Sequence, residues 1–330
     1  MVPKKILDSW NRVNIRIDDF CKEDKDNSFR LLFISDVHIG AESAHHIEQL
    51  KYLKELLPSS KINLVVNGGD IGLDVGEDDA EARRVIEATK EATEYDVPYF
   101  FIKGNHDVKP SIIDNNDLNL ILNTYFINNI KEPTETIILD KENGGGYGYF
   151  INELTSTKVI FLNTCENVRG FDMSINQLHF VIDQLEKEKE KNIVIISHYC
   201  INPCGAWKRY PEKDTFGISA LKKIESSFAK KEKGQYECLT YDFSKAKGNI
   251  LLHLCGDSHF NNQSTSDGYL IACRQGYGGV DPIDMPKDAT FDKFDKHELC
   301  NFDILVITPK GHSKLFRVGA GEMIRDIEIC

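Results

Sequence analysis

Short apolar runs and helical patterns alternate along the first hundred residues. Three apolar runs are typical of buried strands: 30–35 (RLLFIS), 62–67 (INLVVN) and 98–103 (PYFFIK). Two intervening segments are expected to be helices: 45–57, whose apolar side chains have helical spacing and which Pro58 follows, and 79–95, which is charged and contains alanine. This repetition of strand, polar loop and helix predicts a parallel sheet with crossover helices.

The second half of the chain is richer in strand patterns. Strands are expected at 144–150, 158–163, 192–197, 249–255, 269–273, 302–308 and 313–318. Ser174 is expected to cap a helix that runs to about Lys191, with Gln177 as its capping-box partner. We interpret the whole as an α/β fold in which two facing mixed β-sheets, a β-sandwich, are flanked by α-helices.

The expected domain division is simple. Residues 1–28 are interpreted as an N-terminal extension and residues 29–330 as one domain. Within it, residues 202–247 are interpreted as a looser excursion that forms a rim or lid over the site.

Composition and charge narrow the classes of function. The chain has 330 residues, of which 41% are hydrophobic, and its formal net charge is -12. An acidic surface repels a polyanion, so an extended nucleic-acid partner is disfavoured, whereas a small phosphate ester near bound metals is not. No apolar run is long enough to predict a membrane span, and residues 1–20 lack the apolar core of a secretory signal. Nine cysteines without a CxxC pair favour reduced thiols and a cytoplasmic location.

Polar side chains follow the apolar strands directly, most of them beside a glycine. They are Asp36 and His38, Asp70, Asn105 with His106 and Asp107, His198, and Asp257 with His259. Functional groups of α/β sheets collect beyond the carboxyl ends of the strands, so these residues are expected to converge. Carboxylates, imidazoles and an amide oxygen suit divalent metals, and this many candidate ligands favours two ions that share a bridging carboxylate. Manganese or iron is favoured, with zinc, magnesium or nickel as alternatives.

The ordered motifs resemble a known family. Asp36-Val37-His38, Gly69-Asp70, Gly104-Asn105-His106-Asp107, His198 and Gly256-Asp257-Ser258-His259 are similar to the motifs of the calcineurin-like metallophosphoesterases. The resemblance runs from about Leu31 to His259, and its motif order is closest to bacterial cyclic-nucleotide phosphodiesterase-like members. It implies a four-layer metallophosphoesterase fold.

The resemblance also implies residue roles. Asp36, His38 and His259 would hold a first metal; Asn105, His198 and residue 257 would hold a second; Asp70 would bridge them. His106 would protonate the leaving group, oriented by Asp107. The implied function is hydrolysis of a phosphate diester or monoester, a phosphodiesterase or phosphatase activity, by attack of a metal-bridging hydroxide.

The last motif departs from the family, which usually has histidine where this chain has Asp257. Three alternatives remain open: Asp257 ligates the second metal, the second site is weakened or empty, or another group such as His253 or a water substitutes.

Other residues near these motifs are less decided. Five of them are candidates for contact with a base or phosphate, with rim packing as the alternative: Asn202, Trp207, Arg209, Tyr210 and Tyr277. The partner is expected to be a small phosphate ester, and a nucleotide-like ester is one alternative. Two other functions remain, a binding or scaffold protein with a degraded second site and a nuclease. The oligomeric state is left open by the sequence.

Overall fold

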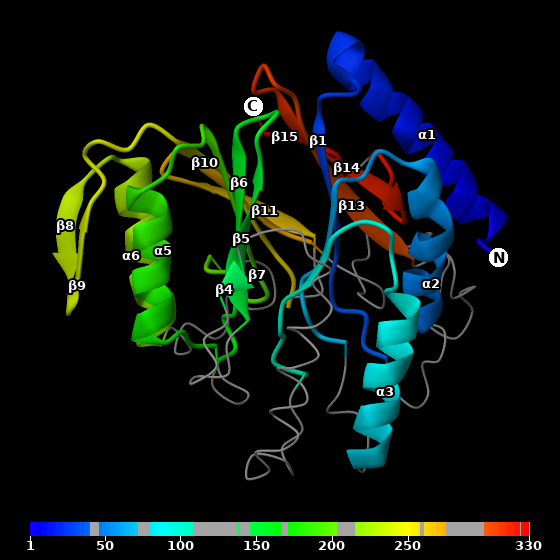
Figure 1. Cartoon of the computed structure of the whole chain (residues 1–330), viewed down its shortest axis with the longest axis horizontal. Coiled ribbons are helices and arrows are strands. Elements are labelled where there is room, and N and C mark those ends of the chain that lie inside the picture. The colour runs from blue at the N-terminus through cyan, green and yellow to red at the C-terminus, as the bar shows by residue number, and fades with distance from the viewer. Residues whose placement is uncertain are drawn as a thin grey trace.

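Two β-sheets face each other at the centre of the molecule (Figure 1). The computed structural model describes residues 1–39, 46–71, 79–107, 137–138, 146–166, 171–202, 215–257, 261–274, 300–323 and 325–329. In spatial order, the first sheet contains β15 (Ile327–Glu328), β14 (Ser313–Gly319), β13 (Asn301–Ile307), β1 (Phe29–Ile34), β2 (Leu64–Asn67) and β3 (Tyr99–Phe101). The second contains β11 (Asn262–Ser266), β12 (Tyr269–Cys273), β10 (Asn249–Cys255), β7 (Asn192–Ser197), β6 (Thr157–Leu162), β5 (Tyr147–Asn152) and β4 (Ile137–Ile138).

The sequence predicted the parallel direction of the first three strands, β1, β2 and β3. β1, β2 and β3 run parallel, as do β6, β7, β10 and β12, whereas β13 pairs antiparallel with β1. Alternate side chains of β1 point to opposite faces: Leu31 and Phe33 enter the core between the sheets, while Leu32 and Ile34 face the helices. Parallel strands end at the same edge, so the loops after β1, β2 and β3 lie side by side.

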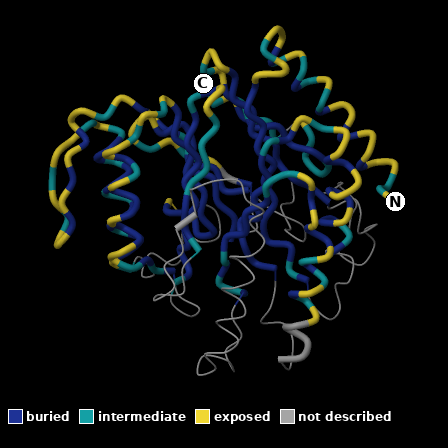
Figure 2. Tube along the Cα trace, in the orientation of Figure 1, coloured by how far each residue is buried: buried dark blue, intermediate teal, exposed yellow. Residues whose placement is uncertain are grey.

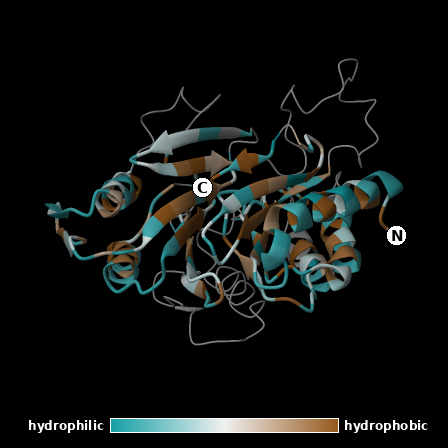
Figure 3. Ribbon diagram, turned by 90° about the horizontal axis from the view of Figure 1, so that it is seen from above, coloured by the Kyte–Doolittle hydropathy of each residue, from teal (hydrophilic) through white to brown (hydrophobic). Residues whose placement is uncertain are grey.

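Helices cover the outer face of each sheet, which completes four layers. α1 (Lys4–Cys21), α2 (His46–Leu56) and α3 (Asp79–Ala92) pack on the first sheet, and α5 (Ile175–Glu186) and α6 (Phe216–Ala229) pack on the second (Figure 1). The central strands of both sheets are buried along their whole length (Figure 2), and the helices show a hydrophobic stripe beside a hydrophilic one (Figure 3). Within the described residues, no helix combines the length and apolarity that a membrane crossing requires. The expected four-layer α/β architecture is confirmed.

Two segments are more ordered than the sequence suggested. Residues 215–247, expected to be a loose excursion, form α6 and a hairpin of β8 (Lys233–Tyr236) and β9 (Leu239–Asp242) that belong to the outer layer. Residues 203–214 lie outside the described residues. In the expected N-terminal extension, α1 buries Trp10 against Phe302 of the first sheet, so this segment is part of the packed core.

The helix cap at Ser174 differs from the prediction in one detail. Ser174 Oγ accepts the Gln177 backbone N–H at 3.2 Å, as expected of a cap. However, the Gln177 side chain does not complete a capping box: it binds both backbone groups of Asn163, at 2.8 and 2.9 Å. The amide thus joins α5 to the end of β6. The helix also ends at Glu186, earlier than the expected Lys191.

A buried ionic cluster links the first sheet to the loop after β12. The carboxylate of Asp303 accepts hydrogen bonds from Arg274 at 2.6 and 3.1 Å and from Arg317 at 3.0 Å. Burial alone would raise the pKa of Asp303, but the charges of the two arginines outweigh it and hold the pKa below its usual 3.8. Because the folded-state pKa is depressed, this carboxylate stabilises the fold above its unfolded pKa and ceases to do so as the pH falls.

Replacement of Asp303 by Asn is expected to lower the free energy of unfolding at pH 7 by roughly 3–5 kcal/mol, because it leaves two buried arginines without their counter-charge. The wild-type protein should lose this advantage from about pH 5 downwards, so the two stabilities should converge in acid. Denaturant unfolding at several pH values measures both effects, with exposed Asp242→Asn as the control. A constant difference between wild type and variant down to the acid limit would contradict the assignment.

Candidate metal centre

The predicted polar residues do converge at one edge of the sandwich. Asp36, His38, Asp70 and Asn105 follow β1, β2 and β3 of the first sheet, and His198 and Asp257 follow β7 and β10 of the second. The loops after β1 and β2 stay paired beyond the strands, since Asp36 N–H donates to Gly69 O and His38 N–H to Asp70 O, both at 2.9 Å. The centre is therefore built where the two sheets meet.

His198 has the most constrained environment in this cluster. Its ring is fully buried, and Nδ1 lies 2.7 Å from Gly68 O, an acceptor that fixes a proton on Nδ1. The other nitrogen, Nε2, faces three oxygens: Asn105 Oδ1 at 3.0 Å, Asp70 Oδ2 at 3.3 Å and Asp257 Oδ1 at 3.7 Å. Nε2 can face three oxygens only if positive charge lies between them, either a proton on the ring or a bound metal ion. The arrangement therefore fits a metal ion held by these four residues.

Asp70 lies between two histidines. Its Oδ1 accepts the backbone N–H of His106 at 2.8 Å. Its Oδ2 is buried and lies 3.3 Å from His198 Nε2 and 3.8 Å from His38 Nε2; within the described residues it accepts no hydrogen bond. The carboxylate thus faces both halves of the cluster, the position that a bridging ligand requires.

The second half of the cluster is formed by Asp36, His38 and Asp70. One ligand atom from each of these residues lies within 4.8 Å of the others. Asp36 Oδ1 accepts the backbone N–H of Asp257 at 2.9 Å, which ties the first sheet to the second at this point. His259, predicted as a further ligand here, lies outside the described residues.

The same residues have an unusual backbone conformation. Asp36, His38, Asp70 and Asp257 have φ angles of 56, 45, 56 and 67°, in the left-handed region that non-glycine residues seldom adopt. Each such residue costs on the order of 1–3 kcal/mol, and this strain gathers at functional sites. The glycines serve close approach: a Cβ on Gly104 would lie 2.1 Å from Asp70 Oδ1, and one on Gly256 would lie 2.5 Å from Asp36 Oδ2.

The buried charges of the cluster attract positive charge. Burial raises the pKa of Asp257 to about 8, and the neighbouring Asp36 and Asp70 carboxylates act in the same direction. Burial acts to lower the pKa of His198, but the negative charge of Asp70 outweighs it and raises this pKa well above 6.5. Three carboxylates in a buried space are stable only with a counter-charge, which divalent cations provide.

His106 and Asp107 are placed differently from each other. The His106 ring contacts the His38 ring edge-on, with 5.3 Å between centroids, and is partly exposed at the cluster. Asp107 is fully buried: its Oδ2 accepts the N–H groups of Asp70 at 2.9 Å and Gly104 at 2.7 Å, and its Oδ1 accepts that of Ile71 at 2.7 Å. These bonds give Asp107 the role of holding the Asp70 loop; its orientation of His106 stays a prediction.

Asp107→Asn is expected to lower the free energy of unfolding by about 1–3 kcal/mol, because an amide cannot accept all three backbone N–H groups. Metal affinity should fall by roughly 10–100-fold, since the loop that carries Asp70 loses its support. Denaturant unfolding and metal titration measure the two effects, with exposed Asp96→Asn as a matched control before β3. An unchanged metal affinity would show that Asp107 stabilises the fold without supporting the site.

His253 is excluded as a replacement for the missing histidine ligand. It is buried on the helix side of β10, where Nε2 lies 2.7 Å from Ser197 Oγ and Nδ1 lies 2.9 Å from Glu225 Oε1. Tyr269 also donates to Glu225, at 2.9 Å, and Ser197 Oγ donates to Tyr199 O at 2.7 Å. This network supports the residues on either side of His198.

Sequence reasoning missed Glu225 as a partner in this network. A signal was present: Ile218, Leu221, Glu225 and Phe228 recur at helical spacing, so the glutamate lies on the buried face of α6. A buried carboxylate on an apolar face requires a partner.

The predicted substrate contacts are mostly outside the described residues. These are Trp207, Arg209, Tyr210 and Tyr277. Asn202 is described, and its amide donates to Ser264 Oγ of β11 at 3.0 Å.

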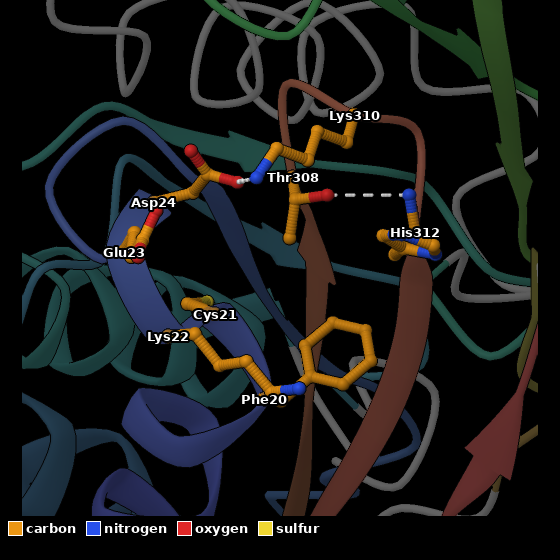
Figure 4. Close-up of a pocket in the computed structure, with 8 residues that line it drawn as sticks. All are labelled: Phe20, Cys21, Lys22, Glu23, Asp24, Thr308, Lys310 and His312. Atoms are coloured by element: carbon orange, nitrogen blue, oxygen red, sulfur yellow. Dashed lines mark hydrogen bonds and ion pairs between the residues drawn. The ribbon is translucent and has the colours of Figure 1, made fainter.

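A separate cavity of about 560 Å³ lies at the opposite end of β1 (Figure 4). Asp24 and Lys310 pair across it at 3.5 Å, and the His312 backbone N–H donates to Thr308 Oγ1 at 3.2 Å. Because Ile307 of β13 pairs with Phe29 at the start of β1, this cavity is remote from the strand ends that carry the metal-ligand candidates.

Comparison with known proteins agrees with this geometry. A model of the calcineurin-like phosphoesterase family matches residues 29–261, more than half of the chain. A search of curated protein sequences gives no match.

Three solved structures share the fold at low sequence identity. A dimetal phosphatase from Danio rerio has a TM-score of 0.60 and 14% identity, and the match covers 91% of this chain and 98% of that chain. Purple acid phosphatase PPD1 from yellow lupin (Lupinus luteus) has a TM-score of 0.56 and 11% identity, with coverage of 88% and 51%. GAP50, the anchor in the inner membrane complex of Plasmodium, has a TM-score of 0.54 and 13% identity, with coverage of 92% and 88%. The chain therefore belongs to the calcineurin-like phosphoesterase family and is a metal-dependent phosphoric ester hydrolase.

Proposed function

We propose that Asp36, His38 and His259 hold one divalent metal, that Asn105, His198 and Asp257 hold a second, and that Asp70 bridges the two. The observation that carries the proposal is the position of His198 Nε2 among three oxygens, with Asp70 Oδ2 also facing His38. The described ligands offer oxygen and imidazole nitrogen without thiolate, which favours manganese or iron over softer ions.

The residues around this centre are placed to take part in the hydrolysis of a phosphate ester. When bound, two divalent metals would supply a nucleophile at neutral pH and stabilise negative charge on the phosphoryl group. His106, partly exposed beside His38, is placed to donate a proton to the leaving oxygen. Asn105 directs its amide oxygen at His198 and leaves its N–H₂ group to bind a phosphoryl oxygen.

The substrate we propose is a small phosphate diester or monoester, and one form of the proposal is a nucleotide-like ester. The net charge of -12 opposes binding of a long nucleic acid. Within the described residues the cysteines form no disulfide, which supports the proposed cytoplasmic location.

Elemental analysis combined with a substrate panel tests this function. The purified protein is expected to contain two equivalents of manganese or iron and to hydrolyse bis(p-nitrophenyl) phosphate, p-nitrophenyl phosphate or both. Chelation should abolish the activity, and metal should restore it. The proposal fails if the metal-loaded protein hydrolyses neither ester.

Asp257→His is expected to strengthen inhibition by inorganic phosphate on the order of tenfold, or about 1.4 kcal/mol. Two divalent ions with Asp36, Asp70 and Asp257 carry a net charge of about +1, and histidine at 257 would leave about +2. Histidine tolerates the left-handed backbone at this position. Phosphate inhibition and bound metal are compared between the two forms; equal inhibition constants at equal metal content would contradict the charge argument.

A second candidate function is a scaffold with a weakened second site. Asp257 in place of the usual histidine favours it, and the similar GAP50 is described as an anchor. A chain that binds fewer than two metals and hydrolyses no ester in the panel would support this alternative.

A further inference from the structure

Three cysteines far apart in the sequence meet beneath α6, on the helix-facing side of the second sheet. One sulfur from each of Cys200, Cys255 and Cys273 lies within 4.8 Å of the other two, and all three are buried. Cys255 of β10 is directly opposite Cys273 of the parallel strand β12, and Cys255 also pairs with Ser197, the last residue of β7. Cys200 lies three residues beyond Ser197. The sheet itself therefore holds the trio in place.

The spacing of these sulfurs suits coordination of one ion. Zinc–thiolate bonds are about 2.3 Å long, so three sulfurs around one ion lie roughly 4 Å apart. The three sulfurs lie within 4.8 Å of one another, which is close to that spacing. Three sulfurs select a thiophilic ion such as zinc, whereas oxygen and imidazole ligands suit harder ions.

The trio adjoins the strand-end centre at the ends of β7 and β10, but it differs in chemistry and faces the helix layer. Its side chains belong to the hydrophobic cluster between the second sheet and α5 and α6. The thiols now donate to backbone carbonyls: Cys200 to Asn202 O at 3.3 Å, Cys255 to Ala272 O at 3.5 Å and Cys273 to Gly256 O at 2.8 Å. A metal would replace these three protons, and a nearby carbonyl or a water would complete four-coordination.

The charge of such a site is balanced further when the neighbouring centre is loaded, although thiolate coordination does not require it. A divalent ion with three thiolates carries about -1, and the proposed two-metal centre carries about +1 with its three carboxylates. The two charges compensate each other across the ends of β7 and β10.

We infer that Cys200, Cys255 and Cys273 form a binding site for one thiophilic divalent ion, of the zinc and cadmium class, separate from the two-metal centre. Such an ion would cross-link the ends of β7, β10 and β12. His198 and Asp257 follow the first two of these strands within three residues, so the ion would also stiffen their supports.

Cadmium titration of the reduced, metal-free, full-length protein tests this inference. Thiolate ligands give cadmium an ultraviolet charge-transfer band, whereas carboxylate and imidazole ligands do not. The band is expected to saturate at one cadmium per chain. It should disappear in Cys273→Ser and persist in Cys300→Ser, which alters a buried cysteine just before β13 of the other sheet. Asp70→Asn should retain the band, which separates this site from the two-metal centre.

Two results would overturn the inference. One is the absence of the band in the folded wild-type protein, and the other is a full-strength band in Cys273→Ser. Circular dichroism establishes that each variant is folded; if Cys273→Ser fails to fold, Cys200→Ser, which alters a residue beyond the strand, provides the same readout.

Discussion

Asp70→Asn should lower kcat by on the order of 10³-fold and remove metal from the purified protein. Its Oδ2 lies 3.3 Å from His198 Nε2 and 3.8 Å from His38 Nε2, so one carboxylate is shared by both halves of the centre. An amide carries no charge to hold two cations and is a poor bridge. A catalytic metal supplies several kcal/mol of transition-state stabilisation. Since each 1.36 kcal/mol is a factor of ten in rate, its loss accounts for the expected effect.

Metal analysis and steady-state kinetics on the same preparations measure this effect. Asp183→Asn, an exposed aspartate on α5, is the matched control and should behave as wild type. Asp70 has a left-handed backbone, so the substitution can change the strain of this loop. Circular dichroism shows whether that change alters the fold. Asp70 would lose its proposed bridging role if the variant kept two metals and a kcat within a few-fold of wild type.

His106→Ala should discriminate between substrates by their leaving groups. For a poorly activated alkyl phosphate, where the departing oxygen needs a proton, kcat should fall by roughly 10²–10⁴-fold. For p-nitrophenyl esters, whose leaving group departs as a stable anion, the loss should be much smaller. The reason is positional: the His106 ring contacts His38 at the edge of the centre and is partly exposed, unlike His198.

A panel of esters that spans leaving-group pKa measures this dependence as the slope of log kcat. Removal of the acid should steepen the slope. Metal content must remain at the wild-type value, and His179→Ala, an exposed histidine on α5, serves as the control. An equal loss on every ester would assign His106 to metal or phosphate binding instead of proton transfer.

Long apolar runs made much of the fold predictable. The strands 192–197 and 249–255 end where expected, because fully buried parallel strands read as unbroken hydrophobic segments. The end of α5 was less predictable: the charged residues 186–191 favour helix, yet the chain must leave it to enter β7. The polar residue that follows each strand was sufficient to locate the centre, since topology brings parallel strand ends together.

Contacts between residues far apart in the chain could not be predicted from the sequence. The Asp107 carboxylate binds three backbone N–H groups, which the sequence could not predict because no side-chain pattern reveals backbone donors. Cys200, Cys255 and Cys273 show no metal-binding spacing, because adjacent strands of this sheet are far apart along the chain. Residues 215–247 lacked strong motifs but form a structural layer through the burial of α6.

The hydrogen bond from the Asp257 backbone N–H to Asp36 Oδ1 joins loops from opposite sheets. Because the proposed ligands come from both sheets, the proposed metal-binding geometry exists only while the sandwich is closed. Ion binding then stabilises the closed state. At a free metal concentration a hundred times the dissociation constant, binding of one ion favours the closed state by about 2.7 kcal/mol. Removal of the proposed ions would thereby lower the free energy of unfolding as well as the activity.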